Sequence, residues 1–403
     1  MATGAGAGVT REDSRFLGSF LVLSVVSGLT VGLGKIVTTL YAISLDATPF
    51  QVGVISAMES VGMVLVTVPA GFLIARYGAR WVYFLSSLGP MLVNLAMPFL
   101  ASWIALALGR WSIGLCIPFR IVSMNGSFLE RVPRFGASKA GWYRASLTGG
   151  MAIVGPVVAT LLTTRASIET IFFVVAGLFG LMALFSLSFL PARERRQGSA
   201  EANFFGELRL LLGHPRVAES CLVEFTSSAT NALFGTFILL LAATIPGLSE
   251  QDGIRVMLFQ GCAMVALLFL GGSLFARMSI SGGYAFSVAA ASLALVTFAS
   301  ATSLGMLAVG AVLLALGSSA VHLINVKMLV ELPGGKSKVA GVYNLASMTG
   351  SSFGALAGGA ASKLVPLNEV FLLWLPLLLA AGLAVQILHH RRSAPAVLAR
   401  GDA

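Results

Sequence analysis

Long apolar stretches separated by short polar breaks run through the whole chain. A helix needs about 20 mainly apolar residues to cross a membrane, because each residue advances it by about 1.5 Å. Twelve stretches meet this requirement, so the pattern predicts an all-α membrane protein with twelve transmembrane helices. These helices are expected at residues 16–44, 51–75, 81–100, 103–129, 142–163, 168–190, 217–243, 254–276, 284–301, 304–331, 339–363 and 369–389.

The second half of the chain repeats the first. The segment AGWYRASLTG at residues 140–149 returns as AGVYNLASMTG at residues 340–350. Arg76 likewise returns as Arg277, which lies 201 positions later. Duplicated halves in a hydrophobic chain are typical of transporters, in which the solute site lies between the halves.

The longest polar break separates the two copies and defines the expected domains. It lies between the sixth and seventh predicted helices, where a repeat of this kind requires a link. We therefore predict two pseudo-symmetric six-helix bundles at residues 1–190 and 217–403, joined by a central cytoplasmic loop at residues 191–216.

The composition supports this organisation and explains the charge. Hydrophobic residues make up 57% of the chain and charged residues 10%, whereas soluble proteins average about 45–50% and 25%. The net charge of +10 does not indicate a nucleic-acid partner, because the basic residues lie in short breaks between apolar stretches. Most fall on one side; the other side has only Arg165 and Lys363, with Arg255 at its edge.

This asymmetry sets the expected orientation in the membrane. Short loops rich in Lys and Arg stay in the cytoplasm. Both termini and the central loop are therefore predicted to be cytoplasmic, with the protein a monomer in the lipid bilayer of the cell inner membrane.

The loop after the second helix carries a recognisable signature. The segment Gly71–Arg80, GFLIARYGAR, resembles the cytoplasmic motif Gly-x-Leu-x-Asp-Arg-x-Gly-Arg-Arg/Lys of the major facilitator superfamily. Ala75 stands where that motif has Asp, and Ala79 stands where it has a basic residue. The positions that match are Gly71, Leu73, Arg76, Gly78 and Arg80.

Two further segments resemble motifs of the same superfamily. Arg110–Gly114 resembles its Arg-x-x-x-Gly element, whose arginine is associated with proton coupling in the family. Gly155 and Pro156 resemble the end of its exporter motif, although the glycine pair that should follow is missing. A kink packed against a small-residue partner is the alternative interpretation of Gly155 and Pro156. The resemblance implies a twelve-helix secondary transporter that uses a proton or ion gradient and no cofactor.

Ionisable residues within membrane helices are costly and usually face a cavity or a partner. Lys35 and Glu59 should lie at similar depth in the outer half, so we predict that they pair; a purely structural ion pair closing the outer end is the alternative. Arg110 lies at comparable depth, which leaves surplus positive charge and favours an anion site. Arg120, deeper in the same helix, either reaches the cavity floor or extends to the cytoplasmic surface.

Polar stripes mark two helices of the second half. Glu224, Ser227, Asn231 and Gly235 lie on one face of the seventh helix, which predicts a cavity-lining surface. The tenth helix repeats this design with Ser318, Ser319, His322 and Asn325, and Gln260 occupies the position equivalent to Glu59.

Two of these side chains are candidates for proton coupling. Histidine changes charge in the physiological range, and Glu224 should lie at a depth similar to His322. We expect this pair to carry the coupling; the alternative is a histidine that is hydrogen-bonded into helix packing.

Gating residues are expected at the cytoplasmic ends of the helices. Glu130 and Glu331 close the fourth and tenth helices 201 positions apart, and Arg144 begins the fifth helix nearby. The predicted hinges and latches are Gly71, Arg76, Gly78, Arg80, Glu130, Arg144, Gly155, Pro156, Arg277 and Glu331.

These features together predict a function. Counting Arg120, Arg255 and Lys327 with the outer cations leaves a positive surplus, so we expect a small organic anion or a zwitterion as substrate, such as a carboxylate-bearing metabolite or a siderophore. Proton-coupled efflux is the expected direction; import by proton symport and a non-transporting receptor or scaffold are the alternatives. No nucleophile–base pair or metal cluster marks an enzyme, and the three cysteines lie in apolar stretches.

Overall fold

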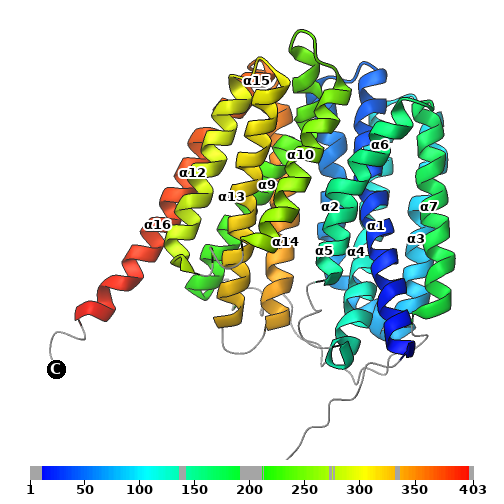
Figure 1. Cartoon of the computed structure of the whole chain (residues 1–403), viewed down its shortest axis with the longest axis horizontal. Helices are drawn as coiled ribbons and strands as arrows, with labels where there is room; N and C mark the ends of the chain where they lie inside the picture. Colours follow the sequence, from blue (N-terminus) through cyan, green and yellow to red (C-terminus); the bar gives the residue numbers. More distant parts are fainter. Residues whose placement is uncertain are drawn as a thin grey trace, which may run out of the picture. The chain divides into compact units, whose positions relative to one another are not determined.

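The computed structural model describes residues 11–135, 142–190, 211, 213–271, 275, 277–331 and 336–398, and these residues form helices and short connections without a strand. Figure 1 shows the helices and their labels. The first half contains α1 (Arg11–Ser44), α2 (Pro49–Tyr77), α3 (Ala79–Ala96), η1 (Met97–Phe99), α4 (Trp103–Phe135), α5 (Trp142–Gly149), η3 (Gly150–Val154), α6 (Gly155–Thr163) and α7 (Ile168–Phe189). The second half contains α9 (Pro215–Thr244), α10 (Glu250–Leu270), α12 (Ile280–Ala299), α13 (Leu304–Glu331), α14 (Lys336–Ala361), α15 (Leu367–Leu373) and α16 (Leu375–Leu398).

The predicted twelve-helix fold is confirmed. Within the described residues, eleven helical segments are long and apolar enough to cross a membrane. The twelfth is α14, which is long enough but rich in glycine, serine and alanine, and these residues lower its hydropathy. Two spans are built from consecutive pieces: α5, η3 and α6 form one, and α15 with α16 forms another.

The chain divides into two compact units, each described here by itself. The first comprises Met1–Tyr41 and Leu65–Gln197, and the second comprises Ala42–Val64 and Gly198–Ala403. The second unit thus includes the beginning of α2, which the prediction placed in the first domain at residues 1–190. Close backbone contact explains this grouping, because a β-carbon on Gly53 would lie 2.6 Å from the carbonyl oxygen of Ala355 on α14.

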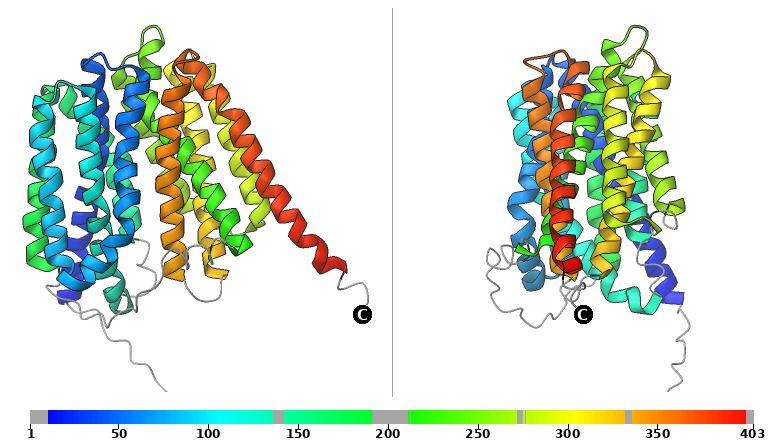
Figure 2. Two further views of the ribbon diagram at one scale, coloured as in Figure 1. Left: turned by 180° about the vertical axis from the view of Figure 1, so that it is seen from behind. Right: turned by 90° about the vertical axis from the view of Figure 1, so that its left-hand side faces the viewer.

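Each unit has its own core of aromatic side chains. In the first unit, Phe20 on α1 stacks on Phe128 on α4 with ring centroids 4.9 Å apart. In the second unit, the ring of Phe298 on α12 lies 5.3 Å from Phe234 on α9 and 5.4 Å from Phe371 on α15. Figure 2 shows α12 and α16 side by side along this unit, in agreement with their contacts.

The sequence repeat is also a repeat of packing. A β-carbon on Gly150 would overlap the carbonyl oxygen of Val25, and one on Gly350 would overlap the carbonyl oxygen of Phe225. Gly150 and Gly350 lie 200 positions apart in the sequence, and so do Val25 and Phe225. The fifth span therefore packs against α1 in the first unit as α14 packs against α9 in the second, through glycines that allow direct backbone contact.

Candidate functional site

Two cations lie close together in the first unit. Lys35 on α1 is exposed, whereas Arg110 on α4 is only 5% exposed. A β-carbon on Gly34 would lie 3.8 Å from Nη1 of Arg110, so the guanidinium reaches the backbone of α1 beside Lys35. The two charges repel each other. Two cations thus lie close together in this part of the unit, and the anion site predicted there stays a prediction.

Glu59 is a buried carboxyl on α2. It is 2% exposed and belongs to the second compact unit, whereas Lys35 belongs to the first. The predicted pairing of Lys35 with Glu59 stays a prediction.

Arg120 is 2% exposed and therefore lies inside the first unit and not at its surface. Its Nη2 donates to the hydroxyl of Ser27 at 3.4 Å and to the hydroxyl of Tyr83 at 3.1 Å, and it lies 3.2 Å from the sulfur of Met182. The guanidinium also lies over the rings of Tyr83, at 5.1 Å, and Phe179, at 4.7 Å. Side chains from α1, α3 and α7 thus surround this cation; its predicted role in binding solute stays a prediction.

In the second unit, Asn231 joins three helices. Its Nδ2 donates to the carbonyl of Ser227 at 2.9 Å and to the hydroxyl of Ser318 on α13 at 2.7 Å. Its Oδ1 accepts a hydrogen bond of 2.9 Å from Nε2 of Gln260 on α10. Both amide hydrogens and the oxygen of Asn231 are therefore engaged within the protein. Through these bonds Asn231 orients Gln260 on α10 and Ser318 on α13.

A second set of hydrogen bonds surrounds Glu224. Oε2 of Glu224 accepts a 2.8 Å hydrogen bond from Nδ2 of Asn325 on α13. Oδ1 of Asn325 accepts one of 2.8 Å from the hydroxyl of Tyr284 on α12, and that hydroxyl shares a 2.7 Å hydrogen bond with Ser220 on α9. Ser220 also lies 2.7 Å from the sulfur of Met328. The structure therefore brings Glu224 and Asn325 together, as two residues of the predicted polar faces.

Ser220 and Tyr284 are not among the residues that the sequence predicted for the site. A signal for Tyr284 was nevertheless present, because Tyr83 occupies the equivalent position 201 residues earlier. Tyr83 contacts Arg120 in the first unit, and Tyr284 contacts Asn325 in the second. The repeat thus places a buried tyrosine hydroxyl beside Arg120 in the first unit and beside Asn325 in the second.

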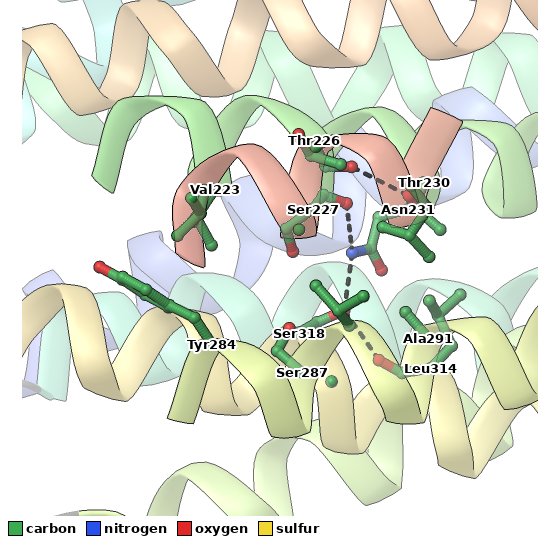
Figure 3. Close-up of a pocket in the computed structure, with 16 residues that line it drawn as sticks. Val223, Thr226, Ser227, Thr230, Asn231, Tyr284, Ser287, Ala291, Leu314 and Ser318 are labelled. Carbon is green, nitrogen blue, oxygen red and sulfur yellow. Dashed lines mark hydrogen bonds between the residues drawn. The ribbon is translucent and has the colours of Figure 1, made fainter. Parts of the chain in front are cut away.

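A pocket within the second unit lies between α9, α12, α13 and α16 (Figure 3). Figure 3 shows Thr226, Ser227 and Asn231 on one side of it, with Tyr284 and Ser318 opposite. The residues that line it are apolar or carry hydroxyl and amide groups, and none of them is charged. Such a lining suits an uncharged or apolar group better than a carboxylate.

Three other ionisable residues from the prediction lie in this unit. His322 is half-buried on α13, one turn before Asn325. Nζ of Lys327 donates to the carbonyl of Met278 at 3.1 Å. Arg255 forms an ion pair of 2.8 Å with Asp252 at the start of α10, so the pair is neutral. Counting Arg255 among the cations of the site was therefore wrong, because a carboxylate one turn away balances it.

Comparison with known proteins identifies the family. The sequence profile described as Major Facilitator Superfamily matches residues 16–285. The chain belongs to the major facilitator superfamily. It is therefore a multi-pass membrane protein and a secondary transporter, as the loop motif and the repeat predicted.

Solved structures of superfamily transporters resemble this one. A mutant of the nucleoside transporter NupG aligns with a TM-score of 0.79 and 14% identity, covering 93% of this chain and 99% of its own. A bacterial homologue of the human lysosomal transporter Spinster, inward-facing and unoccupied, aligns with a TM-score of 0.75 and 14% identity, covering 94% and 98%. A POT family transporter in complex with 5-aminolevulinic acid gives 0.72 and 10%, covering 93% and 96%. The comparison with curated sequences gave no match.

The superfamily motif after α2 shapes a tight connection. Gly78 has a φ of 83°, which only glycine adopts without strain, and it links α2 to α3. Nε of Arg80 donates to the carbonyl of Leu190 at 2.6 Å, and this bond ties the start of α3 to the end of α7. Arg76 and Arg277 are exposed, and Arg76 lies 5.3 Å from the ring of Tyr77.

Other predicted gating residues have different surroundings. A β-carbon on Gly155 would lie 3.2 Å from Cα of Gly32, and the π-helical turn η3 ends at Val154, directly before Gly155 and Pro156. This is the small-residue contact that the kink interpretation predicted; the link to export stays a prediction. The surroundings of Gly71 and the side chains of Glu130, Arg144 and Glu331 lie outside the described part of the chain.

Proposed function

We propose that this protein is a proton-coupled exporter of a small organic anion or zwitterion. The observation that carries the substrate class is the juxtaposition of Lys35 and Arg110 in the first unit. Two cations that repel each other inside a membrane protein are stabilised by a bound anion, because the anion offsets both the repulsion and the cost of desolvation. Lys35 is exposed, so its ammonium is available to a ligand.

The proposed coupling group is Glu224, with His322 as its partner on α13. Glu224 accepts a hydrogen bond from Asn325 in the membrane-spanning part of α9. A carboxyl that gains and loses a proton at such a position changes the charge of the unit during each transport cycle. The proposed direction rests on the resemblance of Gly155 and Pro156 to the exporter motif.

The names of similar structures offer two model substrates. One neighbour transports nucleosides, and another was solved with 5-aminolevulinic acid. 5-Aminolevulinic acid carries both a carboxylate and an ammonium group, whereas uridine is uncharged at neutral pH. Comparing them therefore separates a charge-selective site from a site for neutral solutes.

Purified protein in liposomes with an imposed pH gradient tests the proposal. With the interior more acidic than the exterior, antiport drives uptake of labelled 5-aminolevulinic acid, and uridine is not taken up. Uptake only when the exterior is more acidic would establish symport and overturn the proposed direction. Uptake of uridine alone would overturn the substrate class, and thermal stabilisation by ligand without any flux would support a receptor.

A further inference from the structure

The hydrogen bonds that connect Tyr284 and Asn325 to Glu224 run in one direction. The hydroxyl of Tyr284 donates to Oδ1 of Asn325, and Nδ2 of Asn325 donates to Oε2 of Glu224. Both of these hydrogens point towards Glu224, and Oε2 of Glu224 acts as an acceptor. This arrangement matches the deprotonated carboxylate, which has acceptor positions only.

Protonation of that oxygen would require the line to reverse. A protonated Oε2 donates, so Asn325 must turn its amide over and accept with Oδ1. The Nδ2 group then faces the hydroxyl of Tyr284, which must pass its own hydrogen to Ser220. Ser220 can donate in turn to the sulfur of Met328, which lies 2.7 Å away. Glu224, Asn325, Tyr284 and Ser220 each keep a hydrogen-bond partner within the line in both arrangements, and Met328 accepts from Ser220 in the reversed one.

Burial makes these two arrangements distinct. The side chains of Tyr284, Asn325, Ser220 and Met328 are all 3% exposed or less. A buried polar group that loses its partner has no water to replace it, so a partly reversed line is unfavourable. The line crosses from α9 to α12 and to α13, and its direction is therefore coupled to how these three helices pack.

We propose that Tyr284 and Asn325 are positioning residues for Glu224, and that protonation of Glu224 at Oε2 reverses the hydrogen-bond line from Glu224 to Ser220. The reversal links proton binding to the packing of α12 against α9 and α13. This inference rests on the proposed proton coupling and assigns it a structural route within the second unit.

Other ionisable groups share these surroundings. Cys221 on α9, Tyr284 on α12 and Tyr343 on α14 interact electrostatically with Glu224, and Glu219 on α9 acts on Tyr284. His322 and Lys327 flank Asn325 on α13. The described side chains of α16 include no ionisable group. Those of α10 are Glu250, Asp252, Arg255 and Cys262, and α15 has Glu369 in its first turn. The ionisable groups on α9, α12, α13 and α14 therefore make up the electrostatic environment of Glu224.

Tyr284→Phe tests the proposal, because it removes one hydroxyl and keeps the ring. Without that hydroxyl, Asn325 is free to offer its oxygen to the protonated acid, so the pH profile of 5-aminolevulinic acid flux should move to higher pH by about one unit. Glu224→Gln should abolish the pH dependence. The double variant should behave like Glu224→Gln alone, because Tyr284 acts through Glu224.

Ser281→Ala is the matched control. It also removes a hydrogen bond from α12, in this case to Gln386 on α16, and leaves the line to Glu224 intact. Its pH profile should equal that of the wild type. A Tyr284→Phe profile that coincides with the Ser281→Ala profile would overturn the proposal, as would additive effects of Tyr284→Phe and Glu224→Gln.

An infrared titration separates this inference from the proposed function. The band of a protonated carboxyl that disappears in Glu224→Gln reports proton binding to Glu224 without any substrate. In Tyr284→Phe this band should change position and develop at higher pH. If the band is unchanged, the inference fails even where flux is proton-driven. If the band shifts while wild-type flux ignores the pH gradient, the hydrogen-bond line stands and the proposed transport mechanism fails.

Discussion

The cations within the membrane helices of this transporter have different surroundings. Arg120 is buried among aromatic rings and hydroxyl groups, whereas Lys35 is exposed. Guanidinium groups stack on aromatic faces and donate in several directions within one plane, so Arg120 suits a structural position. An ammonium group is compact and not planar, so it cannot stack on a ring and donate in several directions of one plane. The two residues should therefore respond in opposite ways to substitution.

Arg120→Lys is expected to destabilise the protein by about 2 kcal/mol, because lysine keeps the charge but loses the planar contacts with Tyr83 and Phe179. Thermal unfolding of the purified protein in detergent measures this effect. Lys35→Arg serves as control and should unfold within about one degree of the wild type. Equal unfolding temperatures for Arg120→Lys and the wild type would contradict the structural role.

Lys35→Gln should leave the unliganded protein at least as stable as the wild type, since it removes repulsion with Arg110. The same substitution should weaken binding of 5-aminolevulinic acid by about tenfold, through loss of a direct charge contact. Thermal shifts across a ligand titration measure both quantities. Unchanged affinity would remove Lys35 from the proposed site.

At the level of helices, glycines at the contacts determine how closely two helices pack. Gly150 and Gly350 occupy equivalent positions on the fifth span and on α14, and each lies against a carbonyl of its partner helix. No larger residue fits there without moving a backbone. The sequence repeat therefore produces the same glycine contact in each unit.

Gly350→Ala is expected to destabilise the second unit by about 1–3 kcal/mol, because the added carbon would overlap the backbone of Phe225 and push α9 away from α14. Gly341→Ala on the same helix is the control, since nothing lies within 4 Å of the added carbon. That control should be neutral or stabilising by up to about 1 kcal/mol. Thermal unfolding that ranks the two variants the other way would contradict the role of this glycine contact.

At the scale of the whole molecule, charge asymmetry predicts topology. Basic residues gather in the loops on one side of the predicted spans, and Arg165 and Lys363 stand nearly alone on the other. Retention of such loops in the cytoplasm is a general feature of insertion. Orientation is therefore a property of the chain's loops and does not depend on how the helices pack.

A fluorescent reporter that folds only in the cytoplasm should be bright when fused after Ala403 and dark when fused after Thr164, between α6 and α7. Fluorescence in intact cells, normalised to the amount of fusion protein, gives the result. A reporter of the opposite compartment at the same two positions should show the reverse pattern. Bright signal from the Thr164 fusion would invert the proposed topology.

The twelve spans, the duplicated halves and the superfamily could be predicted from the sequence alone. Hydropathy and repeat spacing are properties of neighbouring residues or of aligned copies, so they require no knowledge of packing. The sequence also predicted that Lys35 and Arg110 lie at comparable depth. Only the tertiary structure decided which polar groups meet, because hydrogen-bond partners lie on different helices and depend on helix rotation. It enclosed Arg120 among aromatic rings, engaged both amide hydrogens of Asn231, and joined Glu224 to Asn325 and Tyr284, residues up to 101 positions apart.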